Sequence, residues 1–288
     1  MKNKSNIEAL CELITDRKDH LALFTRPTEG HWNAMLRRLN DFRIAATSSK
    51  TGCHDEEIWT FLTSLAYADS GLSGNKKLFQ LLTESDDHDL TDGLQWLEPL
   101  PLPPRNGEGN TNLDLALGGI RKRKNTSHGI EYDGTERPIV FCEMKWFSDL
   151  SYGVSGDPHR NQLIRVIENA LTFQNADSLP STCHVTLVTP REFKSRTQGS
   201  RFYQYKFEEY SNAANGAEAI LSELDSCRLN PYTNQGWKYP EESVLKERVE
   251  NLNLHWVTFE DLIVAAPDNE LANHVRLFEK AYNHTSQR

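Results

Sequence analysis

The stretch IVFCEMKWF, from Ile139 to Phe147, is an apolar run with two charged residues set into it, Glu143 and Lys145. Together with Arg137 and Pro138 before it, the run predicts a β-strand of the kind that is buried within a sheet. Side chains alternate between the two faces of a strand, so Glu143 and Lys145 point the same way, about 7 Å apart along the chain. The opposite face then carries four apolar side chains, which are Val140, Cys142, Met144 and Trp146.

A second strand of this kind is predicted at 111–119, TNLDLALGG, and it carries an acid of its own, Asp114. Alternation places Asp114 beside Ala116 and Gly118, on the face opposite three leucines, Leu113, Leu115 and Leu117. Unpaired charges are costly to bury, so the acids and the lysine of the two strands are expected to pair or to hold a metal ion. A buried ion pair between Lys145 and one of the two acids is the simpler alternative.

The chain contains a second Glu-x-Lys, at Glu192 to Lys194, and it has a different context. It follows Pro190 in a polar stretch, and no acid-bearing strand precedes it. We interpret it as a surface feature. Context, and not the spacing of two charges, therefore distinguishes Glu143 and Lys145.

The region before these strands is predicted to be mostly helical. Apolar residues recur at helical spacing in four segments, at 6–14, 31–46, 55–68 and 75–84. A Pro/Gly-rich connection at 97–110, LEPLPLPPRNGEGN, cannot be helix.

The region after them predicts one crossover helix and two more strands. The helix is expected at 157–175, with Asp157 as its N-cap and Pro158 in its first position. Strands are expected at 183–190 and at the start of 252–263, which runs on into a short helix, and the last residues are expected to be helical. This order predicts an α/β fold with a central mixed sheet flanked by helices.

We expect one compact domain with three parts. Residues 1–50 form an N-terminal helical extension, 51–265 form the core with an insertion at about 191–251, and 266–288 form a C-terminal helix.

Composition limits the classes of function. The 288 residues are 38% hydrophobic and carry a net charge of −9, which argues against a protein that coats nucleic acid by bulk charge. A local basic cleft remains compatible with this balance. The chain has no apolar run long enough to span a membrane, its first residues are charged, and its five cysteines are scattered, so we expect a cytoplasmic protein with no membrane partner.

Asp114, followed on the next strand by Glu143-Met144-Lys145, resembles the Asp…(Asp/Glu)-x-Lys signature of the PD-(D/E)XK nuclease superfamily. The likeness covers roughly 50–265 in the order of elements. It implies a restriction endonuclease-like three-layer core. The chain departs from the family pattern in having Leu113 where proline often precedes the aspartate, and in the long segment 191–251.

The resemblance also implies a metal centre. Asp114, Glu143 and the main-chain carbonyl of Met144 would bind Mg²⁺, with Mn²⁺ able to substitute, and hard carboxylate oxygens suit these ions. A bound divalent ion can activate water and stabilise the charge that develops on phosphorus. Lys145 would orient the attacking water or stabilise that charge.

Members of the family often add a glutamate from an N-terminal helix, and the chain offers Glu56 and Glu57. Glu57 leads the apolar stripe that continues through Phe61 and Leu65, whereas Glu56 lies over threonines, so we expect Glu57 to be the metal-linked catalytic acid. An ordinary first-turn glutamate, favoured by the helix dipole, is the alternative.

Two further groups are expected to support the site or bind nucleic acid. Arg160 and Gln162, at the start of the crossover helix, resemble the polar residues that support the site in the family; a solvated first helical turn is the alternative. The run Arg121, Lys122, Arg123 and Lys124 lies between the two site strands and is expected to contact phosphates; a solvated hairpin is the alternative.

The resulting hypothesis is a Mg²⁺-dependent endonuclease that cuts DNA, with restriction or phage defence as its biological context. RNA is a further possible substrate, and a homodimer would suit double-strand cleavage. The alternative is a catalytically inactive nuclease-like scaffold that binds nucleic acid or a protein partner. Acids that converge on an open cleft would favour the nuclease, and a Lys145 buried against an acid would favour the scaffold.

Overall fold

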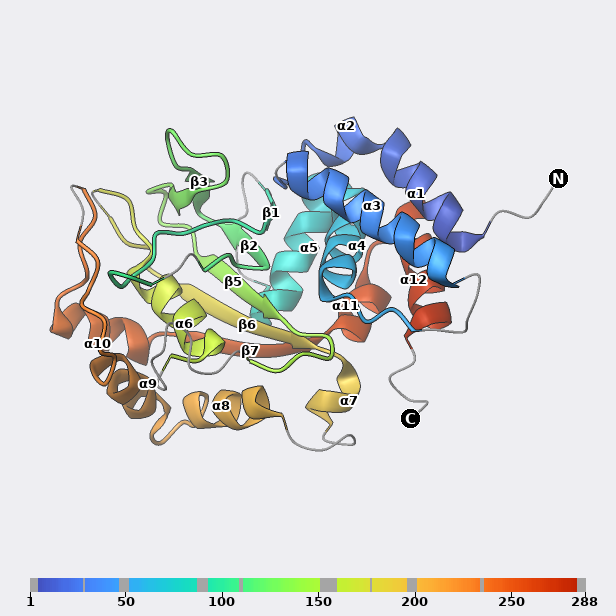
Figure 1. Cartoon of the computed structure of the whole chain (residues 1–288). Coiled ribbons are helices and arrows are strands. Elements are labelled where there is room, and N and C mark those ends of the chain that lie inside the picture. Colours follow the sequence, from blue (N-terminus) through green and yellow to red (C-terminus); the bar gives the residue numbers. More distant parts are fainter. Residues whose placement is uncertain are drawn as a thin grey trace.

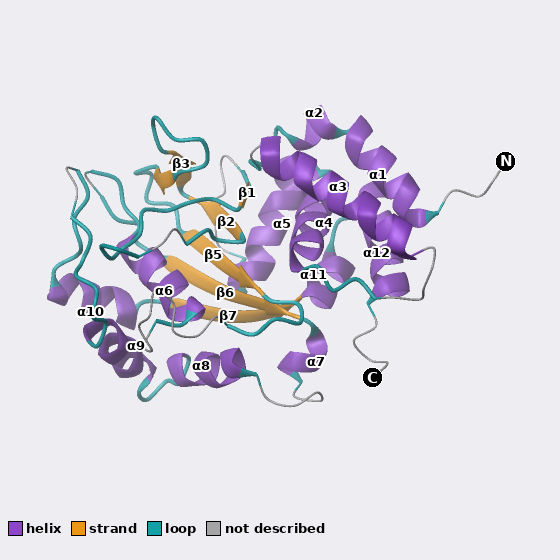
Figure 2. Ribbon diagram, viewed as in Figure 1, coloured by secondary structure: helices purple, strands orange, loops and turns teal. Residues whose placement is uncertain are grey.

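A five-stranded mixed sheet forms the centre of the protein (Figure 2). The computed structural model describes residues 5–27, 29–46, 52–86, 93–108, 111–150, 160–176, 178–195, 201–233 and 236–283. The strands, in their order across the sheet, are β1 (Trp96–Leu97), β2 (Leu115–Gly118), β5 (Ile139–Met144), β6 (Cys183–Thr189) and β7 (Asn253–Thr258). Strand β2 is antiparallel to both of its neighbours, β1 and β5, whereas β5, β6 and β7 run parallel to one another. The expected α/β fold with a central mixed sheet flanked by helices is confirmed.

Helices cover both faces of this sheet, which explains why β2, β5 and β6 are buried along their whole length. Helix α5 (Gly71–Thr83) packs on one face, and α6 (Gln162–Thr172) packs on the other. The alternation predicted for β5 is confirmed. Val140, Cys142 and Met144 lie on the α5 face of the strand, and they share one core cluster with Trp146, two residues past the strand end. The prediction for β2 is wrong at Leu113, which joins the α6 side because the strand begins only at Leu115.

A helical layer built from both ends of the chain lies beside the α5 face (Figure 1). It consists of α1 (Asn6–Asp16), α2 (Lys18–Leu21), α3 (Glu29–Ala46), α4 (Glu56–Ala68), α11 (Phe259–Ala265) and α12 (Glu270–Tyr282). Helix α12 packs directly against α1 and α4, so the C-terminal segment and the expected N-terminal extension share one core.

The insertion expected at 191–251 is more helical than predicted. It contains α7 (Arg191–Lys194), α8 (Phe202–Tyr210), α9 (Gly216–Asp225) and α10 (Glu242–Glu250). The last three pack beside α6 and extend the layer on that face. The second Glu-x-Lys lies on the four-residue α7, and Lys194 is exposed there, as its context indicates.

Two local expectations differ from the structure. Helix α6 begins at Gln162, because Asn161 is extended and its side chain accepts a hydrogen bond from the Ile164 N–H at 3.0 Å. The expected cap and first residue, Asp157 and Pro158, lie outside the described residues. The basic run belongs to a small hairpin of β3 (Ile120–Lys122) and β4 (Ile130–Tyr132) that the sequence analysis did not predict. In the described part of the chain, no helix is long and apolar enough to cross a membrane.

Candidate active site at the end of strand β5

The two acids of the predicted signature lie opposite each other at the end of β5. The register pairs Leu115 with Cys142, so Asp114 stands opposite Glu143 in the antiparallel pair. Strand β2 begins only at Leu115, and the Asp114 carboxylate accepts the Met144 N–H at 2.6 Å. This bond satisfies a main-chain group that β2 leaves open, so it fixes the Asp114 carboxylate at the strand end.

The ammonium of Lys145 lies between two carboxylates. Its Nζ is 2.7 Å from Glu143 Oε1 and 3.1 Å from Glu56 Oε1, and the side chain is buried. The main chain of Lys145 is held from the other side, because its N–H donates to the Val188 carbonyl at 2.8 Å. Lys145 therefore joins β5 to helix α4.

The helix glutamate at this site is Glu56 and not Glu57. Glu56 Oε2 accepts the Trp146 N–H at 2.9 Å and the Ser148 hydroxyl at 2.6 Å, in addition to the Lys145 contact through its other oxygen. Glu57 pairs with Arg38 at 3.1 Å instead, and its side chain is 40% exposed. The helix-face argument favoured Glu57, whereas the glutamate that contacts Lys145 is Glu56, and Glu57 lines the cavity beside Asp114.

The reason lies in the surroundings of α4. Every residue from Ile58 to Ala68 is buried, including Thr60, Thr63 and Ser64. A helix enclosed on all sides has no solvated face, so its polar stripe does not point to water. The sequence does carry a signal for Glu56. Asp55 is the N-cap of α4, so Glu56 is the first residue of the helix and lies at its N-terminal end.

Burial and mutual repulsion raise the pKa values of the acids. Burial, followed by the neighbouring charges of Glu143 and Glu56, raises the pKa of Asp114 well above its usual range. Burial also raises the pKa of Glu143, although Lys145 and Arg165 oppose the shift. Burial alone would lower the pKa of Lys145, but the three surrounding carboxylates outweigh it and raise that pKa.

The site has an excess of negative charge. When all three carboxylates, those of Glu56, Asp114 and Glu143, are ionised, the single ammonium of Lys145 leaves a net charge of −2. Both oxygens of Glu143 are buried and lack a hydrogen-bond partner among the described residues, although Oε1 has its ion pair. Hard oxygen donors with this charge suit Mg²⁺ or Mn²⁺.

The side chains as placed do not yet form a metal cluster. Within the described ranges, no three His, Cys, Asp or Glu side chains are grouped closely enough to hold a metal ion. The Lys145 ammonium lies between Glu56 and Glu143, where a bound cation would otherwise neutralise the two carboxylates. Metal binding therefore requires the acids to close up and this ammonium to shift.

A small cavity opens beside Asp114, and it is lined mainly by acids. It has room for about 10 Å³ of water, and its walls are His31, Glu56, Glu57, Thr60, Leu97, Glu98 and Asp114. A space of this size holds about one water molecule. Glu98 has a φ of 49°, and its carboxylate lies 2.9 Å from His31 Nδ1. Left-handed backbone at a residue other than glycine clusters at functional sites, so Glu98 is an acid that the sequence analysis missed.

Arg160 does not reach the acids of the candidate site. It is fully buried and pairs with Glu108 and Glu168, each at 2.7 Å. Gln162 is the half-buried first residue of α6. The α6 charge that acts on Glu143 is Arg165, which lowers the pKa of Glu143 and pairs with Glu108 at 2.9 Å. No signal in the sequence separated Arg165 from its helical neighbours.

The basic run lies at the other end of β5. Arg121 and Lys122 are on β3, Arg123 and Lys124 follow in the turn, and Gly118, just before the hairpin, pairs with Ile139. Four residue steps along β5, from Ile139 to Glu143, span about 13 Å. The run therefore does not border the phosphate that Glu143 and Lys145 would contact.

Comparisons of the chain with protein-family models, with curated proteins and with solved structures gave no match.

Proposed function

We propose that the protein is a divalent-metal-dependent nuclease with a restriction endonuclease-like core, a member of the PD-(D/E)XK superfamily that hydrolyses phosphodiester bonds of DNA. The observation that carries this proposal is that Glu56 and Glu143 pair with Lys145 while Asp114 accepts the neighbouring Met144 N–H, so that acids from three separate elements lie at the end of β5. A purely structural ion pair needs one acid for one lysine. Two additional half-buried acids beside this pair cost stability unless they serve a cation or a reaction.

The topology supports the same proposal. An antiparallel pair, β2 and β5, followed by the crossover helix α6 and the parallel strand β6, places the ends of both site strands at one edge of the sheet. The helix glutamate that the family often adds is present there as Glu56.

The metal, when bound, supplies a Lewis acid for the phosphate and lowers the pKa of a water molecule. Asp114, Glu143 and the Met144 carbonyl would hold it. Lys145 keeps its proton at neutral pH because its pKa is raised, so it stabilises negative charge on the phosphate and does not act as a base. Glu56 fixes the segment that carries this lysine, through Trp146 and Ser148.

Cleavage assays test the proposal. Supercoiled, linear and single-stranded DNA, and RNA, are incubated with the protein and Mg²⁺ or Mn²⁺, and the variants are Asp114→Asn, Glu143→Gln and Lys145→Met. We expect DNA cleavage by the wild type and a loss of about a hundredfold or more in each variant. The matched control is the surface Glu-x-Lys: Glu192→Gln and Lys194→Met retain full activity. Equal activity in site variants and wild type overturns the proposal.

A specific observation favours a second candidate, the inactive scaffold. Lys145 is buried and 2.7 Å from Glu143, and the adjoining cavity holds only about 10 Å³ of water. Calorimetric titration with Mg²⁺ and Mn²⁺ separates the two candidates. Metal binding that is lost in Asp114→Asn supports the nuclease, and nucleic-acid binding without any metal binding supports the scaffold.

A further inference from the structure

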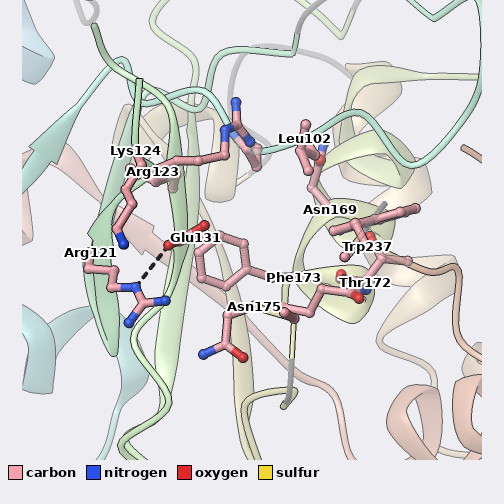
Figure 3. A pocket seen from close by; sticks show the side chains of 15 residues that line it. Leu102, Arg121, Arg123, Lys124, Glu131, Asn169, Thr172, Phe173, Asn175 and Trp237 are labelled. Carbon is pink, nitrogen blue, oxygen red and sulfur yellow. Dashed lines mark hydrogen bonds and ion pairs between the residues drawn. The ribbon is translucent and has the colours of Figure 1, made fainter. Parts of the chain in front are cut away.

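A pocket with basic, aromatic and amide walls lies away from the acidic site. It has a volume of about 390 Å³, within the range of pockets that bind small ligands. Its walls are the β3–β4 hairpin, the C-terminal end of α6 and the segment around Trp237 (Figure 3). Nothing in the proposed cleavage chemistry uses it.

One wall is positively charged. Arg121, Arg123 and Lys124 line it together with the acid Glu131, which leaves a net charge of +2 in a chain of net charge −9. Glu131 pairs with Arg121 at 2.9 Å, as the dashed line in Figure 3 marks. The excess positive charge is therefore carried by Arg123 and Lys124.

Arg123 carries an unused donor. Burial lowers the pKa of Arg123, and its Nη1 is buried without a hydrogen-bond partner among the described residues. A guanidinium donor buried in this way is costly unless an anion accepts it. Guanidinium and ammonium groups both bind phosphate through charge-assisted hydrogen bonds.

The facing wall is aromatic and carries an unused acceptor. Figure 3 shows the Phe173 ring between the basic side chains and Trp237, with Asn169 beside Trp237. Asn169 is 1% exposed, and its Nδ2 donates to the Arg165 carbonyl at 2.9 Å. Its Oδ1 is buried and has no partner among the described residues, so it is available to a donor in the pocket.

The aromatic wall is held in place by hydrogen bonds. Gln174, just after α6, donates to the Lys238 carbonyl at 2.7 Å and accepts the Lys238 N–H at 3.0 Å. This pair of bonds fixes the segment next to Trp237 against the end of α6. The aromatic wall is thus set before any ligand binds, which reduces the entropy cost of binding.

We propose that this pocket binds one nucleotide. Its phosphate pairs with Arg123 and Lys124, its base lies against Trp237 and Phe173, and a donor on the base faces Asn169. Bases stack on aromatic side chains regardless of sequence, and an amide oxygen accepts from an amino or ring N–H. The nucleotide is either free or an unstacked unit of a nucleic-acid strand, since both present the same chemistry.

This inference goes beyond the proposed cleavage activity, because binding in the pocket needs neither metal nor hydrolysis.

Equilibrium binding in metal-free buffer with a chelator tests the inference independently of nuclease activity. The probes are the four deoxynucleoside 5′-monophosphates, the four deoxynucleosides, inorganic phosphate and a ten-residue single-stranded oligodeoxynucleotide. The readouts are calorimetry and tryptophan fluorescence. The variants are Arg123→Gln, Lys124→Gln, Asn169→Leu and Trp237→Phe, and the matched control is Lys122→Gln, on the same hairpin but outside the pocket lining.

We expect monophosphates to bind more tightly than nucleosides or phosphate alone, with quenching that Trp237→Phe removes. Arg123→Gln weakens binding by about tenfold. Lys122→Gln leaves it unchanged. Binding of the oligonucleotide alone, with the same pattern among variants, assigns the pocket to a unit of a strand.

Absence of binding to every probe overturns the inference, as does equal affinity in Arg123→Gln, Lys124→Gln and wild type. Circular dichroism verifies that each variant is folded, and the exposed Lys124 provides a variant that leaves the buried wall intact.

Discussion

Lys145 is the residue on which the candidate site depends. Its ammonium is shared by Glu143 and Glu56, and burial, together with repulsion from the neighbouring acids, raises the pKa values of Asp114 and Glu143. A folded protein retains such repulsion only where the rest of the structure outweighs its cost. Under the proposed function, a bound cation would relieve this repulsion, and the acids would favour the cation-bound state at the expense of the metal-free fold.

Asp114→Asn is expected to stabilise the metal-free protein at neutral and higher pH. The folded-state pKa of Asp114 is raised, so the wild type loses stability as pH rises from about 4, the unfolded value, through the folded pKa. Asparagine does not titrate, and its side-chain oxygen can still accept the Met144 N–H. Urea denaturation between pH 3 and pH 8 measures the gain, which grows with pH and vanishes at the acidic end.

Asp261→Asn is the control of opposite sign. Burial would raise the pKa of Asp261, but its hydrogen bonds from Thr258 and Arg191 outweigh this and lower it. The wild-type carboxylate thus adds stability above the unfolded pKa, and asparagine reduces stability at neutral pH. A stabilisation by both substitutions would show that the effect of Asp114→Asn is not electrostatic repulsion at the site.

The pair Glu56→Gln and Glu57→Gln separates the two helix glutamates. Glutamine at 56 can still accept from Trp146 and Ser148 but no longer neutralises Lys145, so we expect cleavage and metal affinity to fall about tenfold or more. Glutamine at 57 loses only a partly exposed pair with Arg38 and should leave both nearly unchanged. A larger loss in Glu57→Gln would restore the original prediction that Glu57 is the metal-linked acid.

At the scale of elements, β5 could be predicted because the pattern that defines a strand lies within a few consecutive residues. The two faces of a strand follow from a period of two residues, and Val140, Cys142 and Met144 obey it. The choice between Glu56 and Glu57 failed because burial of α4 on every side is a tertiary property. The β3–β4 hairpin was missed because only Ile120, Ile130 and Tyr132 are buried in it, too few for a pattern.

The buried network around α6 was also beyond the sequence, since its members are far apart in the chain. Arg160 pairs with Glu108, from the Pro/Gly-rich connection, and with Glu168, from α6, while Arg105 also pairs with Glu168 at 2.7 Å. The network fastens that connection to α6. It also positions Arg165, the residue of α6 whose charge lowers the pKa of Glu143.

Arg160→Ala should be strongly destabilising. Removing this fully buried guanidinium leaves the carboxylates of Glu108 and Glu168 with less compensation, which costs about 3–5 kcal/mol when a partner of a buried pair is lost. Urea denaturation measures the change. The double variant Arg160→Met with Glu108→Gln should recover part of it, because one buried charge is removed with its partner. A loss below about 1 kcal/mol would contradict a structural role for the network.

At the scale of the whole molecule, aromatic contacts connect the site to the C-terminal helix. Trp146, next to Lys145, stacks on Trp59 of α4 with ring centroids 4.1 Å apart. Trp59 in turn contacts Phe278 of α12 edge to face at 5.2 Å. The segment that carries the candidate lysine therefore rests on a core to which both ends of the chain contribute.

Phe278→Ala tests whether this core is one cooperative unit. Phe278 is fully buried, and truncation of such a ring costs about 3–5 kcal/mol through lost burial and the cavity left behind. If the helical layer and the sheet form one domain, far-UV circular dichroism and tryptophan fluorescence will report a single coincident urea transition, shifted to lower urea in the variant. Tyr282→Ala, at the half-buried end of the same helix, is the control and should shift that transition less. Two separate transitions, with only the first moved by Phe278→Ala, would instead show that α1, α3 and α12 unfold apart from the sheet, and that the site strand keeps its fold without them.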